Sequence, residues 1–321
     1  MLRLLLDVQD LADARFTISP LHETVGSLWP VYHGRGHPVH NRWARQVRSH
    51  PGLPHELLSA MISPRGWIPD FLAPPPDAAR PSIAAQLAQV RATPPARVLG
   101  DVVAAYGPDP LPDALAGLDR DPADVRDQVA GAVGTYWELV IAPHWPRIQT
   151  LLESDLMYRG HQLAQAGHGL AFDGLDHRIR WQQGTLTVNV IRQWRRELPV
   201  AGRGLRLVPS LLVSHPYVPV NDGHEPVVSY PARRAAVLWE VPAPPPPGVA
   251  RALLGRSRSR LLALLDEPAS TTDLAVQLGV TPSAVSQHLR VLAAAGLVDR
   301  DRVGRAVLYR QTESGARLAA G

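Results

Sequence analysis

The chain has 321 residues and a formal net charge of +4, and 45% of its residues are hydrophobic, which is enough for ordinary buried cores in two domains. It contains no cysteine, and all 33 basic residues are arginine, so disulfides, thiolate metal sites and lysine-dependent chemistry are excluded. No run of about 18 uncharged apolar residues occurs, and Met1 to Gln9 lacks the features of a signal peptide. We therefore expect a cytoplasmic protein that does not enter a membrane.

The N-terminal part of the chain mixes helix and strand signals. Leu2 to Leu6 alternates apolar residues as a strand does, and Ser19-Pro20 combines an N-cap with a first-turn proline. The helix opened by this pair has one apolar face, made of Leu21, Val25 and Leu28. Asp121-Pro122 repeats the start signal and predicts helix up to Ala142.

A long helix and several strands are expected next. Trp145 to Gly167 is typical of an amphipathic helix, whose apolar face is Ile148, Leu151, Leu152, Leu156 and Leu163. Four later runs alternate like strands: Ile179 to Trp181, Leu186 to Val190, Leu205 to Val213 and Val227 to Tyr230. Gly184 lies between the first two, where a hairpin turn is expected. The predicted fold class of this part is therefore α+β.

A proline-rich segment marks the boundary between two domains. Residues 242–248 include four consecutive prolines, which exclude helix and favour a semi-rigid spacer. We predict an N-terminal domain over residues 1–241 and a second domain over residues 249–321. Residues 1–248 carry 23 arginines and 23 acidic residues, whereas residues 249–321 carry 10 and 6. The surplus of positive charge thus lies in the second domain, which indicates either phosphate binding or a solvated basic face.

The second domain has the local signals of helices joined by a tight turn. An amphipathic run extends from Arg256 to Glu267. Ser270 to Asp273 is a capping box that opens a short helix ending at Gly279. Thr281-Pro282 opens another helix, which ends at Gly296. The last two helices and their three-residue connection predict a helix-turn-helix.

The second helix of this pair is expected to have an apolar and a polar face. Its 3.6-residue period turns inward the apolar residues Val285, Leu289 and Leu292. The opposite face carries side chains that suit base edges and phosphates, namely Ser283, Ser286, Gln287 and Arg290. Two short strand-like runs then flank Gly304 and predict a wing whose basic residues are Arg300, Arg302 and Arg305. Thr312 is the expected cap of a last short helix. One such helix alone would signify little, but four pieces in this order indicate a winged helix-turn-helix.

Four short motifs of this domain also keep the spacing of a known family. They are STTDLA at 270–275, SQHLRVL at 286–292, AGLV at 295–298 and GRAVLY at 304–309. These motifs resemble those of the ArsR family of bacterial winged-helix repressors. The resemblance implies a groove-reading role for Ser283, Ser286, Gln287, His288 and Arg290, and a wing role for Arg302 and Arg305. We include Thr271 and Thr272 among the expected DNA-binding residues. More loosely, residues 10–29 and 209–239 resemble the large N-terminal domains of some actinobacterial members.

Two features depart from that family. Its metal sensors carry cysteines on the first helix of the reading head, whereas Thr271 to Leu278 contains neither cysteine nor histidine. The family also dimerises through its outer helices, and the last helix expected here is short. We therefore expect no metal and no cofactor, and dimer contacts that involve residues before Pro242.

Histidines and tryptophans of the first domain allow two further interpretations. His33, His37 and His40 have ligand-like spacing, but the intervening glycines and proline break any shared helix face. All eight tryptophans lie between Trp29 and Trp239, where core packing is the common role and lining of a ligand pocket the alternative.

The sequence as a whole predicts a dimeric ArsR-type transcriptional repressor, not an enzyme. Its expected partners are double-stranded DNA, a second copy of the chain and an unidentified small-molecule effector, with residues 1–241 serving dimerisation, sensing or both. The alternative is a small-molecule-binding or enzymatic N-terminal domain with an accessory winged helix. The absence of lysine, cysteine and a nucleophile motif counts against an enzyme but leaves carboxylate and histidine chemistry open.

Overall fold

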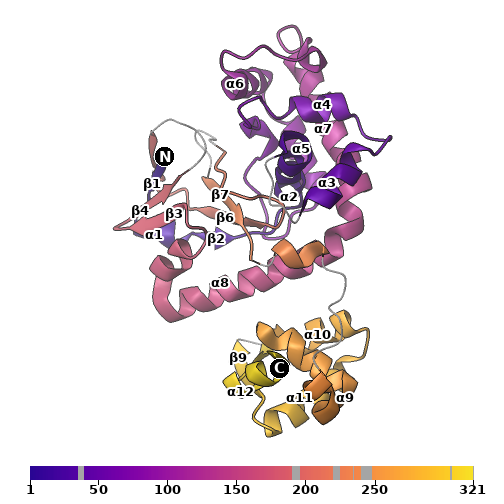
Figure 1. Ribbon diagram of the computed structural model, residues 1–321. Coiled ribbons are helices and arrows are strands. Elements are labelled where there is room, and N and C mark those ends of the chain that lie inside the picture. The colour runs from indigo at the N-terminus through magenta and orange to yellow at the C-terminus, as the bar shows by residue number, and fades with distance from the viewer. Residues whose placement is uncertain are drawn as a thin grey trace. The chain divides into compact units, whose positions relative to one another are not determined.

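The computed structural model describes residues 1–34, 40–189, 196–219, 225–233, 235–239, 248–303 and 306–320. The chain forms two compact units, Met1–Trp239 (unit 1) and Glu240–Gly321 (unit 2), which are coloured from indigo to orange and from orange to yellow in Figure 1. Helices and sheets both occur, which confirms the predicted α+β class. No helix among the described residues has the length and apolar character needed to cross a membrane.

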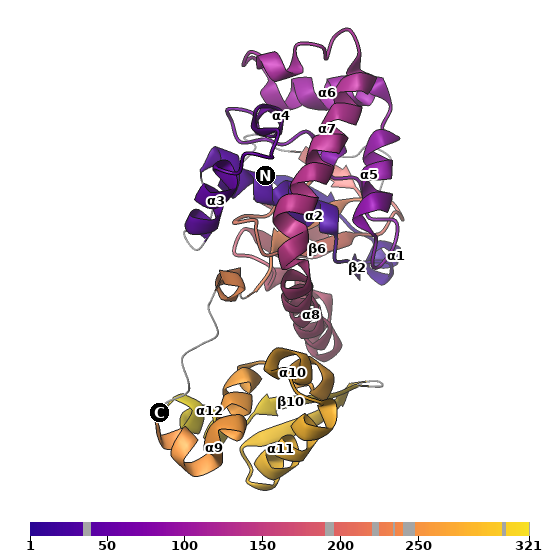
Figure 2. The same cartoon turned by 90° about the vertical axis from the view of Figure 1, so that its right-hand side faces the viewer.

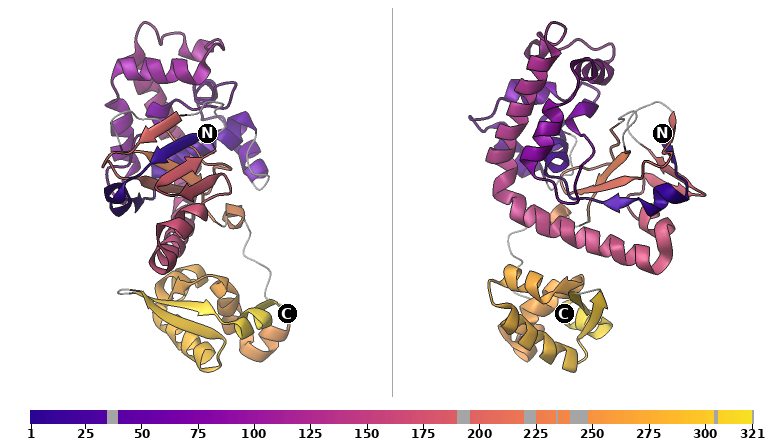
Figure 3. Two further views of the ribbon diagram at one scale, coloured as in Figure 1. Left: turned by 90° about the vertical axis from the view of Figure 1, so that its left-hand side faces the viewer. Right: turned by 180° about the vertical axis from the view of Figure 1, so that it is seen from behind.

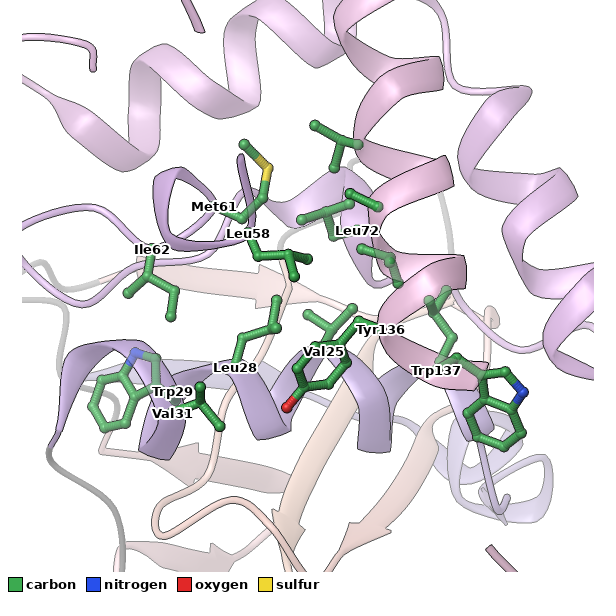
Figure 4. Packing of buried hydrophobic residues seen from close by; sticks show 14 of the residues in the cluster. Val25, Leu28, Trp29, Val31, Leu58, Met61, Ile62, Leu72, Tyr136 and Trp137 are labelled. Atoms are coloured by element: carbon green, nitrogen blue, oxygen red, sulfur yellow. The ribbon is translucent and has the colours of Figure 1, made fainter. Parts of the chain in front are cut away.

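The first part of unit 1 is a set of helices around one apolar core. They are α2 (Pro20–Leu28), α3 (Asn41–Arg48), α4 (His55–Ala60), α5 (Ile83–Arg91), α6 (Pro95–Tyr106) and α7 (Pro122–Tyr136), with the helical turns η1 (Trp29–His33), η3 (Asp70–Leu72), η4 (Asp113–Leu115), η5 (Trp137–Ile141) and η6 (Ala142–His144). The Ser19 and Asp121 side chains cap α2 and α7, which confirms both predicted starts. Figure 4 shows Val25, Leu28 and Tyr136 in this core, where all three are fully buried.

The other part of unit 1 contains two sheets. The strands are β1 (Leu2–Leu5), β2 (Arg15–Phe16), β3 (Ile179–Gln182), β4 (Thr185–Val188), β5 (Arg196–Pro199), β6 (Arg206–Ser210) and β7 (Val227–Pro231), with α1 (Val8–Ala12) after β1 and the turn η7 (Ala235–Trp239) after β7. One sheet has the order β3-β4-β1-β5, with β1 antiparallel to β4 and parallel to β5. The other has the order β2-β6-β7 and is parallel throughout. Gly184, with φ +77°, forms the predicted turn between β3 and β4.

The longest helix, α8 (Trp145–Asp173), belongs to both parts of unit 1, as Figure 1 and the right panel of Figure 3 show. Ile148 and Leu152, near its start, join the core of the helices. Ala171 and Phe172, near its end, join the core of the sheets. The helix therefore contributes residues to both apolar cores of unit 1.

A buried charged pair fixes α8 against the parallel sheet. Asp155 is 3% exposed, and its Oδ2 accepts a hydrogen bond from the Tyr230 hydroxyl on β7 at 2.8 Å. Arg159, one turn later and 2% exposed, lies 3.7 Å from the same carboxylate and donates to the Gly174 carbonyl at 2.7 Å. Because each charge has a partner, the pair is tolerated in the interior. The hydrogen bond from Tyr230 to Asp155 links α8 to β7.

Several predicted element ends are wrong. The strand predicted from Leu205 to Val213 ends at Ser210, because the next backbone N–H, that of Leu211, donates to the Glu23 carboxylate at 3.0 Å instead of to a neighbouring strand. The residues after Ser210 stay buried, so their apolar pattern matched that of a strand. The predicted helix that ends at Gly167 continues to Asp173 across a non-helical glycine with φ +69°. The short strand β2 and the mostly polar strand β5 were not predicted.

Two titratable side chains at the start of α2 are fully buried. The His22 Nδ1 lies 2.8 Å from the Ser19 Oγ, which also accepts from the Gln86 amide at 2.8 Å. The next residue, Glu23, accepts hydrogen bonds from the Leu211 N–H. Burial lowers the pKa of His22 to about 3 and raises the pKa of Glu23 to about 7, so the folded protein favours the neutral form of both groups.

These two pKa shifts make stability depend on pH in opposite directions. The contribution of Glu23 is present below its unfolded pKa, near 4.5, and is lost as the pH rises through about 7. The contribution of His22 is present above its unfolded pKa, near 6.5, and is lost as the pH falls toward 3. Between pH 4.5 and 6.5 the two dependences cancel, each amounting to about 1.4 kcal/mol per pH unit.

Replacing Glu23 by glutamine is expected to remove one of these two pH dependences and leave that of His22. The free energy of unfolding of the variant, relative to the wild type, should increase from pH 4.5 to pH 7 by on the order of 3 kcal/mol, because the variant has no carboxylate to desolvate. Urea titrations followed by tryptophan fluorescence measure it, since every tryptophan lies in unit 1. Glu56→Gln, at an exposed position of α4, controls for the loss of one acidic residue. A difference that stays constant over this pH range would contradict the burial argument.

Candidate nucleic-acid interface

Unit 2 begins with α9 (Gly248–Ala263), followed by the helical turn η8 (Leu264–Asp266). The predicted helix from Arg256 therefore starts earlier than expected, and Gly248, assigned to the linker from the sequence, is helical. Gly255 has φ +77° and interrupts α9, which explains why only the residues after it showed a continuous helical pattern.

Local hydrogen bonds build the helix pair as predicted. The Ser270 Oγ accepts from the Asp273 N–H, and Asp273 Oδ2 accepts from the Ser270 N–H, so the capping box at the start of α10 (Thr271–Leu278) is confirmed. Gly279 ends α10 in the left-handed conformation, with φ +67°. After a three-residue turn, the Thr281 Oγ1 accepts from the Ala284 N–H and opens α11 (Pro282–Ala294).

The two faces of α11 differ sharply in exposure. The apolar residues Val285, Leu289 and Leu292 are 0% exposed and pack in the core of unit 2. Ser283, Gln287 and Arg290 are exposed, and Ser286 and His288 are half-buried. On α10, Thr272 is exposed, while Thr271 is half-buried in the first turn. The residues expected to read DNA thus include the exposed polar side chains of α11.

A two-stranded wing follows α11. Strands β9 (Val298–Val303) and β10 (Ala306–Gln311) pair antiparallel, from Ala306 opposite Val303 to Gln311 opposite Val298. The left panel of Figure 3 shows this hairpin extending away from the helices. A third strand, β8 (Ala269–Ser270), pairs with β10 on its other side and was not predicted. Arg302 lies on β9, and Arg305 lies outside the described residues.

The last helix, α12 (Glu313–Ala320), packs within unit 2. The Thr312 Oγ1 accepts from the Gly315 N–H at 3.1 Å, which confirms the predicted cap. A side chain at Gly315 would collide with the Leu297 carbonyl, so glycine permits the close approach of α12 to the start of the wing. Leu318 packs against the same core as α11.

The surface of unit 2 presents arginines that are available to an anion. Arg256 and Arg260 on α9, Arg290 on α11 and Arg300 on β9 are exposed and make no ion pair with any described residue. Arg310 lies 3.5 Å from Asp301 across the wing. Free guanidinium groups on the recognition helix and on the wing suit contacts with phosphate and base edges.

The described residues contain no group of three or more histidine, aspartate or glutamate side chains arranged to hold a metal ion. His37 lies outside the described residues. His33 stacks on Trp29 with ring centroids 5.1 Å apart, and the His40 Nδ1 accepts from the Trp239 indole N–H at 2.7 Å. The two described histidines of that motif therefore take part in aromatic packing.

Comparisons with known proteins agree with this geometry. A helix-turn-helix domain model matches residues 253–301. The transcriptional regulator NmtR of Mycobacterium tuberculosis is 47% identical over 60 residues, which are 18% of this chain and 50% of NmtR. The transcriptional repressor SmtB of the same organism is 38% identical over 96 residues, which are 27% of this chain and 68% of SmtB. The chain belongs to the ArsR family of transcriptional regulators.

The likeness to these relatives is partial. This chain spans half the length of NmtR, and neither relative matches more than 27% of this chain. Among solved structures, a mutant of ZitR from Lactococcus lactis is 27% identical with a TM-score of 0.19, covering 19% of this chain and 45% of ZitR. Reduced HlyU from Vibrio cholerae is 34% identical with a TM-score of 0.19, covering 22% of this chain and 74% of HlyU. Neither score indicates a shared fold over the whole chain.

Proposed function

We propose that this ArsR-family protein is a dimeric repressor that reads double-stranded DNA through α11 and the wing. In this proposal, residues 249–321 form the DNA-binding domain, and residues 1–241 supply dimer contacts, sense a small molecule or do both. Membership of a family of DNA-binding regulators supports the first part, as does the name of SmtB, a transcriptional repressor.

The division of α11 into a buried and an exposed face is the main support. The buried face of α11 holds the helix in the core through three fully buried apolar residues. Packing therefore does not require the polar residues of the exposed face. The other side exposes an amide at Gln287 and a guanidinium at Arg290. An amide pairs well with adenine and a guanidinium with guanine in the major groove. Thr281 and Pro282 place the start of the helix, where such contacts are usual, at the surface.

Replacing Gln287 or Arg290 by alanine tests this assignment. Each variant should bind a DNA fragment selected by the wild-type protein more weakly by about 1 to 3 kcal/mol, because one base-edge contact is lost. The fold should persist, since both side chains are exposed. Anisotropy titrations at fixed salt, with far-UV circular dichroism on the same samples, measure both properties.

Arg317→Ala is the matched control for charge, because Arg317 is exposed on α12, away from the recognition helix. It should leave the preference for the selected sequence over a scrambled one unchanged. If Gln287→Ala and Arg290→Ala both kept the wild-type preference, α11 would not be the reading element.

A sensing role for unit 1 is favoured by one specific observation. The carboxyl ends of parallel strands β2 and β6 face the start of α2, an arrangement that commonly forms ligand sites in parallel sheets. Fully buried polar side chains gather there, among them Ser19, His22 and Glu23. The His22 Nε2 is buried without a hydrogen-bond partner among the described residues, and a small molecule or a water that accepts or donates there would satisfy it.

The alternative is that unit 1 is an enzyme to which the winged helix is an accessory. Ser19 and His22 lie within hydrogen-bond distance of each other, as in a nucleophile and its base. Against that role, Ser19 is 1% exposed and its oxygen already accepts from the His22 N–H as the cap of α2. A buried hydroxyl that caps a helix has a structural role. We therefore favour sensing over catalysis for unit 1.

A further inference from the structure

Residues 1–248 are neutral in total, but their charges are unevenly distributed. Residues 24–55 contain four arginines and five histidines and no aspartate or glutamate. Helix α3 lies within this segment and carries three of the arginines, Arg42, Arg45 and Arg48. A chain average therefore conceals a concentrated basic element in the larger unit.

The helix is anchored by its apolar side and displays the basic side. Trp43, Ala44 and Val47 are buried, at 7%, 1% and 6% exposure. Arg42 and Arg45 are exposed and one helical turn apart, so they project from neighbouring positions. Arg42 and Arg45 lie three positions apart, about 4.5 Å along the helix axis, which is comparable to the rise of about 3.4 Å between successive phosphates of one DNA strand. Arg48 instead donates a hydrogen bond to the Val31 carbonyl at 2.5 Å.

Acidic residues neutralise several arginines elsewhere in unit 1 but not the exposed arginines of α3. Elsewhere, Arg97 pairs with Asp101 at 3.1 Å and Arg126 pairs with Asp127 at 2.9 Å. Arg42 and Arg45 form no ion pair with any residue that the structure describes. Surface arginines without counter-charges are the electrostatic signature of phosphate recognition.

Helix α3 also supports the end of unit 1. Trp239, the last residue of η7, stacks on Trp43 with ring centroids 5.1 Å apart and donates its indole N–H to His40 at 2.7 Å. Figure 2 shows η7 as the short orange turn near α3. Eight residues separate Trp239 from Gly248, where α9 begins. A tether this short gives DNA held by α11 an effective concentration on the order of millimolar at a site on unit 1.

We infer that the exposed face of α3 is a second DNA-contacting surface, which binds phosphates of the duplex that α11 reads. This inference rests on the proposed DNA binding by unit 2. A membrane surface is a poorer fit, because an interfacial helix inserts its apolar face into lipid and the apolar face of α3 is already buried in unit 1. Phosphate contacts need only the arginines and the neighbouring polar residues Asn41, Gln46 and Ser49, which are exposed.

The test measures the salt dependence of DNA binding by the full chain. With a 40-base-pair duplex of mixed sequence, R42Q/R45Q should reduce the slope of log affinity against log salt by about 1.8, because two phosphate contacts are lost. Between 50 and 200 mM salt, the wild-type affinity should then fall about tenfold more than that of the variant. R42K/R45K, which keeps both charges, should restore most of the slope. Tryptophan fluorescence, to which Trp43 and Trp239 contribute, reports whether unit 1 stays folded.

R91Q/R120Q is the matched control, because it removes the same charge from exposed positions of unit 1 outside α3. Equal losses in both double variants, or no loss in R42Q/R45Q, would overturn the inference. So would a loss confined to binding of phosphatidylserine vesicles. If the wild type and R42Q/R45Q bind duplex DNA identically, only the inference about α3 is rejected. A Q287A/R290A protein that keeps the wild-type sequence preference rejects the proposed function instead.

Discussion

Leu289→Ala is expected to destabilise unit 2 by about 2 to 5 kcal/mol, because it removes a fully buried side chain from the middle of α11 and leaves a cavity in the core. A domain of this size rarely has more than about 3 to 5 kcal/mol of stability, so much of unit 2 should be unfolded at 25 °C. Urea titration of the full chain by far-UV circular dichroism detects the loss. Tryptophan fluorescence should show an unchanged transition for unit 1, where all eight tryptophans lie.

Val291→Ala is the matched control for Leu289→Ala. Val291 lies on the same helix but is 43% exposed, so its truncation should change the free energy of unfolding by less than about 0.5 kcal/mol. Equal effects of the two substitutions would contradict the assignment of faces on α11. DNA binding by Leu289→Ala should fall in proportion to the folded fraction, unlike that of Gln287→Ala.

A fragment of residues 249–321 is expected to bind DNA about 10²- to 10⁴-fold more weakly than the full chain on a two-half-site fragment. A single winged helix reads one half-site, and a second one joined to it binds at high effective concentration. Helix α12 has eight residues and already packs within its own unit, so it offers little surface for pairing two fragments. The fragment should sediment as a monomer and the full chain as a dimer.

The fragment lacks both the phosphate contacts of α3 and the second half-site, and the full chain with R42Q/R45Q distinguishes these two contributions to affinity. That variant should remain a dimer and lose only the salt-dependent contribution of α3, whereas the fragment should lose the second half-site as well. A fragment that dimerises and binds as tightly as the full chain would show that unit 1 is not the dimer platform, and unit 1 would keep only a sensing role.

Unit 2 could be predicted from the sequence because its signals are local. The Ser270 capping box, the left-handed Gly279 and the Thr281-Pro282 start each involve residues within four positions of one another, and the structure has all three. The wing followed from strand alternation. The pairing of β8 with β10 was not predicted, because a two-residue strand has no period to detect.

Unit 1 resisted prediction because its contacts are distant in the sequence. Leu2 on β1 pairs with Arg196 on β5, and no local pattern encodes that partner. Glu23, on a helix distant in the sequence, accepts a hydrogen bond from the Leu211 N–H, so β6 ends at Ser210 although the apolar run continues. The basic face of α3 does not show in the net charge of residues 1–248, because acidic residues elsewhere in that range cancel it.

The most direct test of DNA reading by α11 is selection of binding sites from a random duplex pool by the full chain and by Q287A/R290A. The wild type should enrich one motif with two inverted half-sites, centred about 10 to 11 base pairs apart as two-fold symmetry requires. The variant should lose that motif while retaining salt-sensitive binding to any duplex. Enrichment of the same motif by both proteins, or of no motif by the wild type, would contradict the assignment of α11 as the reading helix.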